Sequence, residues 1–156
     1  MPPEFLTKAG KKKLDNELDY LRTEKRKEVA ARLREAAESS LGEFVEDPEF
    51  EAAKNEQSFV EGRIRELEII LANAQIIVKR RKTNGLVEIG STVVIKDGRR
   101  NPEEYLIVGA TEANPREGKI SHQSPLGVAL MGAKEGDKVE VAAPAGSFKV
   151  KIVEVK

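Results

Sequence analysis

The chain has no cysteine and no tryptophan, and it contains a single histidine, His122. Without cysteine there are no disulfides, no thiolate metal sites and no cysteine nucleophiles. One histidine excludes metal sites built from several histidines and makes histidine-based catalysis a poor hypothesis. No apolar run approaches the roughly 20 residues that a membrane span needs, and the N-terminal residues do not resemble a signal peptide. We therefore expect a cytoplasmic protein with no membrane partner.

An excess of charge of either sign is also lacking. The 156 residues include 27 Lys+Arg and 27 Asp+Glu, so the formal net charge is zero. This balance argues against binding of nucleic acid or anionic membrane by the whole surface, although it leaves local patches open. Charged residues still make up 35% of the chain and apolar residues only 39%, a balance that suits long exposed helices better than one thick globular core.

Glycine and valine are scarce in the first half of the chain and frequent in the second. Only Gly10, Gly42 and Gly62 precede Asn84, and the other nine of the 12 glycines follow it. Glycine and β-branched residues mark turns and strands, whereas their scarcity among abundant Ala, Glu, Lys and Arg indicates helix. The sequence therefore predicts an α+β protein with a coiled-coil domain over 1–78, a basic linker over 79–85 and a second small domain over 86–156.

The first half predicts two helices of similar length. The first follows Thr7 as N-cap and ends near Ser39, and Lys25 interrupts its apolar seam. The second begins with Asp47 as N-cap and Pro48 as the first helical residue. Its seam has alternating spacings of three and four, which is a coiled-coil pattern: Phe50, Ala53, Gln57, Val60, Ile64, Leu67, Leu71 and Ala74. The short break between the helices predicts an antiparallel hairpin with an exposed tip at 41–47.

The second half alternates like a small sheet. Turn signals such as Asp97-Gly98 and Ala145-Gly146 separate the apolar segments. The expected strands are Ser91–Lys96, Glu104–Gly109, Lys119–His122, Lys138–Ala142 and Phe148–Val155. A short helix over Leu126–Met131 is expected after Ser124-Pro125. The result is a mixed, mainly antiparallel sheet with one short helix.

The expected tip is acidic. The window from Glu35 to Ala53 holds seven acidic residues and no lysine or arginine. One interpretation is a merely polar tip, with acids at a helix start that suit the helix dipole. The other is metal binding: Mg²⁺ accepts one or two protein carboxylates and takes its other ligands from water and phosphate. On that interpretation Glu43 and Glu46 complete a site that another macromolecule half supplies, as in two-metal phosphoryl chemistry.

Two blocks of sequence carry a resemblance. The first starts at Gly42 as Gly-Glu-Phe-Val-Glu-Asp-Pro-Glu-Phe and continues to Ile64. The second runs from Ile120 to Val139 and contains Ser-Pro-Leu-Gly, and the opening Leu-Thr-x-x-Gly that ends at Gly10 also fits. Together they resemble the bacterial transcript-cleavage factors, the GreA/GreB family, over nearly the whole chain.

The resemblance implies an antiparallel coiled coil followed by an FKBP-like domain. It implies that the coiled coil enters the secondary channel of bacterial RNA polymerase and reaches the 3′ end of the nascent RNA. Glu43 and Glu46 would be the catalytic acids, helping to hold a Mg²⁺ shared with the polymerase and its water. The polymerase then hydrolyses backtracked RNA, so the factor stimulates an activity and is not itself an enzyme. A monomer is expected.

The resemblance also places two further candidate regions. The C-terminal domain would dock on the rim of the channel, with docking candidates Ser124, Pro125, Leu126 and Gly127. Where the family often has an arginine facing RNA this chain has Ser39, and Lys54 keeps a positive charge on the second helix as the RNA-facing candidate.

The tip departs from the usual family sequence Gly-Asp-Leu-Lys-Glu-Asn-Ala-Glu-Tyr. Glu43 replaces the first catalytic Asp, and the extra methylene leaves its carboxylate less constrained; a misplacement of about 1 Å costs on the order of 10²-fold in rate. Val45 replaces a lysine. Asn, Ala and Tyr are replaced by Asp47, Pro48 and Phe50. These changes keep open an alternative, a Gre homologue that occupies the channel and inhibits or modulates the polymerase with little cleavage.

Two other classes have weaker support. A prolyl isomerase would use an aromatic-lined pocket, but Tyr105 and Phe148 are the only aromatics after Asn84. A coiled-coil adaptor or chaperone without a polymerase link is the other. Ser124 has no base partner suggested by the sequence, so nucleophilic catalysis is not expected.

Overall fold

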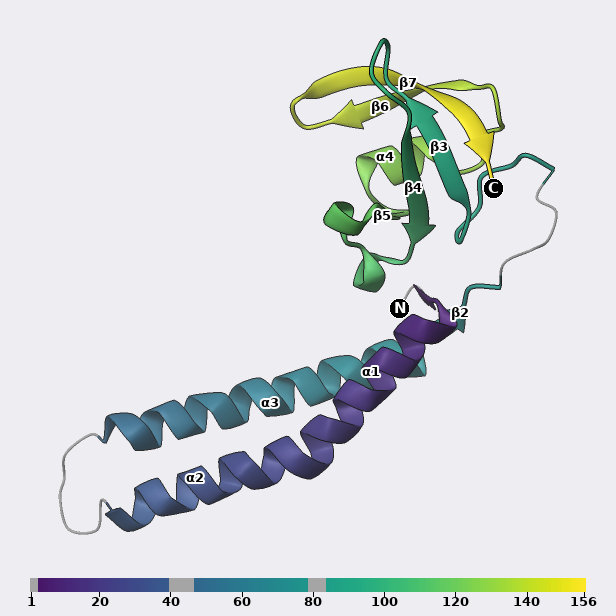
Figure 1. The fold of residues 1–156 in the computed structure, drawn as a ribbon. Coiled ribbons are helices and arrows are strands. Elements are labelled where there is room, and N and C mark those ends of the chain that lie inside the picture. Colours follow the sequence, from purple (N-terminus) through teal and green to yellow (C-terminus); the bar gives the residue numbers. More distant parts are fainter. Residues whose placement is uncertain (1–2, 40–46, 79–83) are drawn as a thin grey trace. The chain divides into compact units, whose positions relative to one another are not determined.

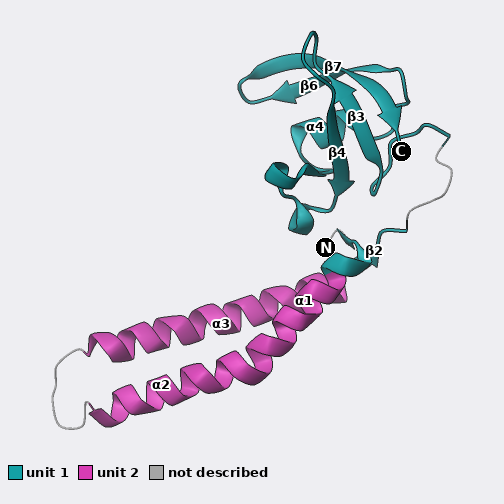
Figure 2. Ribbon diagram, viewed as in Figure 1, with its two compact units in different colours: residues 1–10, 74–156 teal, residues 11–73 magenta. Residues whose placement is uncertain are grey.

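The structure is a computed structural model that describes residues 3–39, 47–78 and 84–156 (Figure 1). It divides into two compact units: Lys11–Asn73 is one, and Met1–Gly10 together with Ala74–Lys156 is the other (Figure 2). The predicted coiled-coil domain covered 1–78, whereas by contacts its two ends group with the C-terminal strands. Most of the predicted tip and linker, residues 41–46 and 79–83, lies outside the described residues. No described helix is long and apolar enough to cross a membrane.

The helical unit is the predicted hairpin. Its first arm comprises α1 (Lys8–Tyr20), the π-helical segment η1 (Leu21–Lys25) and α2 (Arg26–Ser39), and its second arm is α3 (Pro48–Ala72). The arms pack along apolar seams that are buried at Leu14, Leu18, Val29 and Ala36 on one side and at Ala53, Val60, Ile64 and Leu67 on the other. The predicted seam of α3 is confirmed at these four positions, whereas Gln57 is exposed and Ala74 belongs to a strand.

The π-helical segment has a cause in the spacing of the first seam. Between Leu21 and Leu33 the seam advances by three steps of four residues, where alternating steps of four and three would span eleven. One residue is therefore in excess. A π turn accommodates an extra residue by bonding i to i−5, and the N–H of Arg26 donates to the carbonyl of Leu21. The segment lets Leu18 and Val29 reach the same buried seam.

Ion pairs between the arms reinforce the apolar seam. The guanidinium of Arg26 donates to both carboxylate oxygens of Glu61 at 2.7 and 2.9 Å, and that of Arg63 donates to both oxygens of Glu17 at 2.7 and 3.1 Å. Further pairs join Arg22 to Glu68, Lys25 to Glu56, and Arg32 to Glu56. Exposed ion pairs contribute little to stability, so these pairs specify how the two arms align more than they stabilise the hairpin.

The C-terminal unit contains a five-stranded sheet in the order β5-β4-β3-β7-β6. Its strands are β3 (Thr92–Lys96), β4 (Glu103–Val108), β5 (Lys119–Ser121), β6 (Lys138–Ala143) and β7 (Gly146–Val155). All pairings are antiparallel except β4 with β5. The short helix α4 (Pro125–Leu130) packs against β6 and β5. The predicted α+β class, strands and short helix are thus confirmed, with boundaries shifted by one or two residues.

A two-stranded parallel sheet was not predicted. β1 (Glu4–Leu6) pairs with β2 (Ala74–Ile76), which joins the segment before α1 to the segment after α3. β1 also lies against the C-terminal unit at Gly109, where a Cβ would come within 1.9 Å of the carbonyl oxygen of Phe5. Glycine permits this close approach because it has no side chain. The small sheet therefore belongs to the C-terminal unit.

Candidate functional site

The acidic tip connects the two arms of the hairpin. α2 ends at Ser39 and the N-cap of α3 is Asp47. The predicted catalytic and metal-binding residues Glu43 and Glu46 lie between them, outside the described residues. Within the described ranges no group of three or more His, Asp or Glu side chains is arranged to hold a metal ion. The Mg²⁺ assignment therefore stays a prediction that depends on the tip itself.

Asp47 is the residue that begins α3. Its carboxylate accepts a hydrogen bond from the N–H of Glu49 at 3.0 Å, its backbone is extended, and Pro48 follows as the first helical residue. This is the predicted cap: the carboxylate satisfies an N–H group that has no partner inside the helix. Asn and Asp cap equally well, so Asp47 and Pro48 keep the start of α3 sharply defined beside the tip.

Lys54 lies on the second turn of α3, close to the tip. Its side chain is 52% exposed, its ammonium is 4.0 Å from the carboxylate of Glu51, and it lies 5.2 Å from the centre of the Phe50 ring. The aromatic face attracts the cation and holds it near the surface. The predicted RNA-facing lysine is thus available to an anion. At the end of α2, the hydroxyl of Ser39 donates a hydrogen bond to the carbonyl of Ala36 at 3.0 Å.

The predicted docking segment forms the start of α4. The hydroxyl of Ser124 donates to the carbonyl of Ser121 at 2.7 Å and accepts from the N–H of Gly127 at 3.0 Å, which makes Ser124 the N-cap. Gly127 is buried, and a Cβ there would lie 2.0 Å from the Ser121 carbonyl oxygen. Ser124 and Gly127 therefore have structural roles, and a nucleophilic role for Ser124 gains no support.

The exposed part of this segment is apolar. Pro125 is exposed and Leu126 is half-buried against the core. Val128, which was not among the predicted docking residues, is 62% exposed. Pro125 and Val128 are three residues apart and so share one side of the helix. The sequence could have identified Val128, because it is an apolar residue three positions after Pro125 on the same short helix.

His122 has a structural environment. Its ring packs edge-on against Phe5, with 5.4 Å between the ring centres and an interplanar angle of 87°. Its Nδ1 lies 3.4 Å from the carbonyl oxygen of Val108. The only histidine of the chain thus helps to hold β1 against the C-terminal sheet.

The two aromatics of the C-terminal half line one small hollow. Tyr105 and Phe148 lie there with Leu126, around a volume of about 180 Å³. Ligand pockets usually measure about 300–1,000 Å³. The Tyr105 hydroxyl donates to the carboxylate of Glu103, and this bond raises the pKa of Tyr105 to about 12. The hollow gives little support to the prolyl isomerase hypothesis.

Comparisons with known proteins agree across both halves of the chain. The family described as "Transcription elongation factor, N-terminal" matches residues 4–76, and "Transcription elongation factor, GreA/GreB, C-term" matches residues 82–156. A transcription elongation factor GreA of Thermoanaerobacter pseudethanolicus is 48% identical over 99% of this chain and 98% of its own, and one of Roseiflexus sp. is 47% identical with the same coverage. A crystal structure of the GreA factor homolog 1 protein of Thermus thermophilus is 33% identical, covers 99% of both chains and superposes with a TM-score of 0.45.

Proposed function

The chain belongs to the GreA/GreB family of transcription elongation factors, and we propose that it stimulates Mg²⁺-dependent cleavage of backtracked nascent RNA by bacterial RNA polymerase. The match of both family regions in order over nearly the whole chain is the observation that carries this proposal. The hairpin enters the secondary channel of the polymerase, in the cytoplasm, and releases arrested complexes. The chain acts as a monomer and supplies no complete active site of its own.

We assign the chemistry to the tip. Glu43 and Glu46 lie in the segment between the end of α2 and the cap of α3, so the two-helix hairpin carries them. A Mg²⁺ ion shared with the polymerase would supply an activated water for phosphodiester hydrolysis. Two carboxylates alone make a weak site for Mg²⁺. The chain's part is to bring and orient two acids, and we assign Lys54, on the second turn of α3, to the RNA phosphates.

The proposal assigns docking to the C-terminal unit. Pro125 and Val128 present exposed apolar surface at the start of α4. Two other residues hold the start of α4 in place. Ser124 caps the helix, and Gly127 allows it to approach the backbone of Ser121 closely. We assign contact with the polymerase to Pro125, Leu126 and Val128, and positioning to Ser124 and Gly127.

The altered tip supports a second candidate function, a channel-bound inhibitor. Some of the departures are compatible with cleavage because their local roles are evident: Asp47 caps α3, Pro48 suits its first position, and Phe50 lies beside Lys54. Glu43 and Val45 are the departures without such an account. The choice between stimulation and inhibition therefore depends on the reach of the Glu43 carboxylate and on the cation lost at Val45.

A transcript-cleavage assay on backtracked elongation complexes tests the proposal. Wild type is compared with Glu43→Ala, Glu46→Ala and the control Glu28→Ala, an exposed acid of α2, and polymerase binding is measured for each. We expect Mg²⁺-dependent shortening of the RNA with wild type and the control, and its loss in both tip variants with binding retained. Binding without cleavage, together with slowed nucleotide addition, would establish the inhibitor instead.

Glu43→Asp separates the two functions further. Restoring the shorter family side chain should raise the cleavage rate of a stimulating factor, because it constrains the carboxylate more tightly. In an inhibitor that lacks cleavage for other reasons, the same change leaves the RNA uncut. Absence of binding by wild type would contradict both.

A further inference from the structure

The outer side of α3 carries a second stripe of residues at coiled-coil spacing. The seam that packs on the first arm of the hairpin is buried. A further set of α3 residues is exposed and follows alternating spacings of three and four, which places its members on one side of the helix: Ala52, Asn55, Phe59, Gly62, Glu66 and Ile69. We call this set the outer stripe. Such spacing is typical of a helix side that packs against another helix.

The middle of the outer stripe combines a large exposed ring with a gap. Phe59 is 75% exposed. Gly62 follows about one turn later, and a Cβ there would meet nothing within 4 Å. Glycine inside a helix costs about 1 kcal/mol against alanine, although the helical backbone at Gly62 suits any residue. The glycine therefore leaves open space on the helix surface, and nothing in the hairpin itself requires that space.

The apolar residues of the outer stripe complement themselves when the order is reversed. In an antiparallel pair of helices related by a two-fold axis, residue i faces residue j and residue j faces residue i. An axis between residues 60 and 61 places Phe59 opposite the partner's Gly62. The same axis places Ala52 opposite the partner's Ile69. Each of these layers pairs a large side chain with a small one, which lets the two helices approach closely and interdigitate.

The polar residues fit the same register. Asn55 falls opposite the partner's Glu66, so an amide N–H can donate to a carboxylate. Within its own chain the Glu66 carboxylate already accepts a hydrogen bond from Arg63 at 2.8 Å. Glu56 and Arg63 directly follow stripe residues and flank the stripe on one side, where each Glu56 comes near the partner's Arg63. Opposite charges thus meet along the edge of the contact, and the polar layer specifies the register.

We propose that free copies of this chain pair through their outer stripes and form an antiparallel, two-fold symmetric dimer. A second copy is the partner because it presents the complementary order of large, small and polar residues at the same spacing. The contact runs from Ala52 to Ile69, about 27 Å at 1.5 Å per residue. One helix side of this length gives an interface at the small end of specific contacts, below about 1,200 Å² in total. The dimer is therefore weak and forms at high protein concentration.

Pairing is a property of the free chain and is separate from the proposed function. The hairpin is proposed to act on the polymerase as a monomer. None of the residues assigned to the tip, to the RNA phosphates or to docking belongs to the outer stripe. A test without polymerase therefore examines pairing alone, and its failure leaves the cleavage proposal untouched.

Sedimentation equilibrium of the full-length chain over a series of concentrations tests the pairing. Wild type should pass from monomer to dimer as the concentration rises. Phe59→Glu should weaken the dimer at least about tenfold, because it places two carboxylates in the centre of the contact. The matched control is Tyr20→Glu, the same kind of change at an aromatic residue of α1 that is 51% exposed and lies outside the outer stripe. The control should pair like wild type.

Gly62→Ala separates pairing from folding. Its methyl group fills the space that receives the partner's Phe59, and this should weaken the dimer about tenfold. In dilute solution the same variant should melt at a higher temperature than wild type, because alanine favours helix. A lower melting temperature would mean that Gly62 serves the fold of the hairpin and not the dimer.

Single cysteines test the register, because the chain has no cysteine of its own. Asn55→Cys and Glu66→Cys are mixed and oxidised with glutathione disulfide. The two positions face each other in the proposed dimer, so the mixture should give a disulfide-linked heterodimer. Each variant alone places its two cysteines about 16 Å apart along the helix axes, too far for a disulfide. Tyr20→Cys mixed with Glu66→Cys is the control that should not link.

Three results would overturn the proposal. The first is a monomer at every concentration, and the second is a dimer that Phe59→Glu leaves intact or that Tyr20→Glu weakens equally. The third is cross-linking of Asn55→Cys with itself in preference to Glu66→Cys, which would show a parallel or shifted pair.

Discussion

The carboxylate of Glu112 accepts two hydrogen bonds from Thr7, one from its N–H at 2.7 Å and one from its hydroxyl at 2.6 Å. The Thr7 hydroxyl oxygen in turn accepts the N–H of Gly10 at 3.0 Å, so Thr7 is the predicted N-cap of α1. An acid at a helix N-terminus also interacts favourably with the helix dipole. A Cβ on Gly10 would lie 2.2 Å from the Glu112 carboxylate. The Leu-Thr-x-x-Gly motif is thus a cap whose partner carboxylate comes from 105 residues away in sequence.

Gly10→Ala should destabilise the protein by about 2 kcal/mol. Alanine favours helix by about 1 kcal/mol, but its methyl group displaces the Glu112 carboxylate and breaks hydrogen bonds worth about 1.5–3 kcal/mol each. Urea unfolding followed by circular dichroism measures the change. In a Glu112→Ala background the clash is gone, and Gly10→Ala should then be neutral or stabilising. An equal cost in both backgrounds would mean that Glu112 is not the cause.

Gly62→Ala should stabilise the hairpin by about 1 kcal/mol. Gly62 is an exposed residue inside α3, and a Cβ there meets nothing within 4 Å. The gain comes from helix propensity and from lower backbone entropy in the unfolded chain. Thermal unfolding measures it. Gly127→Ala is the contrasting variant, because a Cβ there clashes with the Ser121 backbone, and it should lower the melting temperature.

Deleting Glu24 should be tolerated. It removes the extra residue of the first seam, so the π turn becomes an α turn and the segments on both sides keep their buried faces. Deleting Ala31 from the middle of α2 rotates the following seam by about 100° and should unfold the adjacent part of the hairpin. Circular dichroism melts compare the two deletions. Similar losses of stability would show that the π segment does not compensate a one-residue excess.

The hairpin should lose stability in acid through Glu56 and Glu61. A hydrogen bond from Lys25 lowers the pKa of Glu56, and one from Arg26 lowers that of Glu61, below their ordinary value of 4.5. A lowered folded-state pKa stabilises the fold above pH 4.5, and the contribution is lost as pH falls through the folded-state value. Melting temperatures between pH 7 and pH 3 test this. Glu56→Gln should flatten the decline, and high salt should weaken the contribution because both pairs are exposed.

Tyr105 should lose its phenolic proton only at a pH above the usual range for tyrosine, because its pKa is raised. Its hydrogen bond to Glu103 raises its pKa to about 12, from an ordinary value of 10.0. Spectrophotometric titration of phenolate absorbance should therefore show a late step that belongs to Tyr105. In Glu103→Gln the later step should move down toward 10. An unmoved later step would mean that the carboxylate is not the cause.

The secondary-structure elements and the α+β class follow from local patterns in the sequence. Seam spacings of three and four predicted the hairpin, the Asp47-Pro48 pair predicted the start of α3, and alternation predicted the five strands. The Ser124-Pro125 pair predicted the short helix. These features arise from local periodicity and from capping between residues close in sequence, so they can be predicted from the sequence. The spacing of the first seam likewise shows one extra residue near Lys25. That residue is accommodated by a π turn because the apolar residues on both sides of it must pack against the seam of α3.

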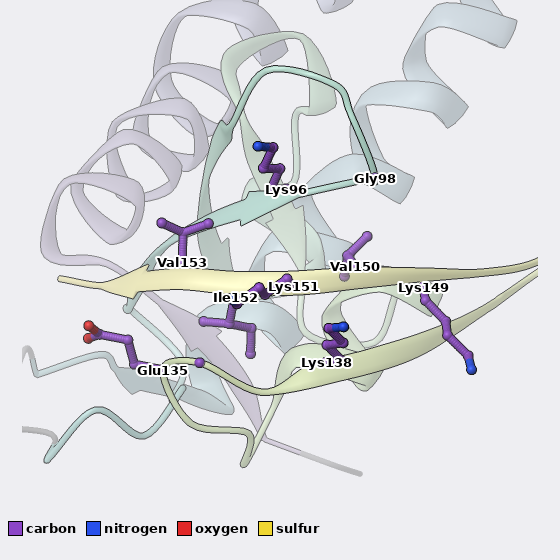
Figure 3. A pocket seen from close by; sticks show the side chains of 10 residues that line it. Lys96, Gly98, Glu135, Lys138, Lys149, Val150, Lys151, Ile152 and Val153 are labelled. Carbon is purple, nitrogen blue, oxygen red and sulfur yellow. The ribbon is translucent and has the colours of Figure 1, made fainter.

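Contacts between residues far apart in sequence became visible only in the folded chain. The pairing of β1 with β2, the Thr7–Glu112 bond and the close approach of Gly109 to Phe5 join segments some 70 to 105 residues apart. Strand register places Lys96, Lys151 and Lys138 side by side on three strands (Figure 3), although they are far from adjacent in sequence. Register depends on the long-range packing of apolar faces, and a single-residue slip would turn these lysines toward the core. Periodicity along one segment carries no information about that choice.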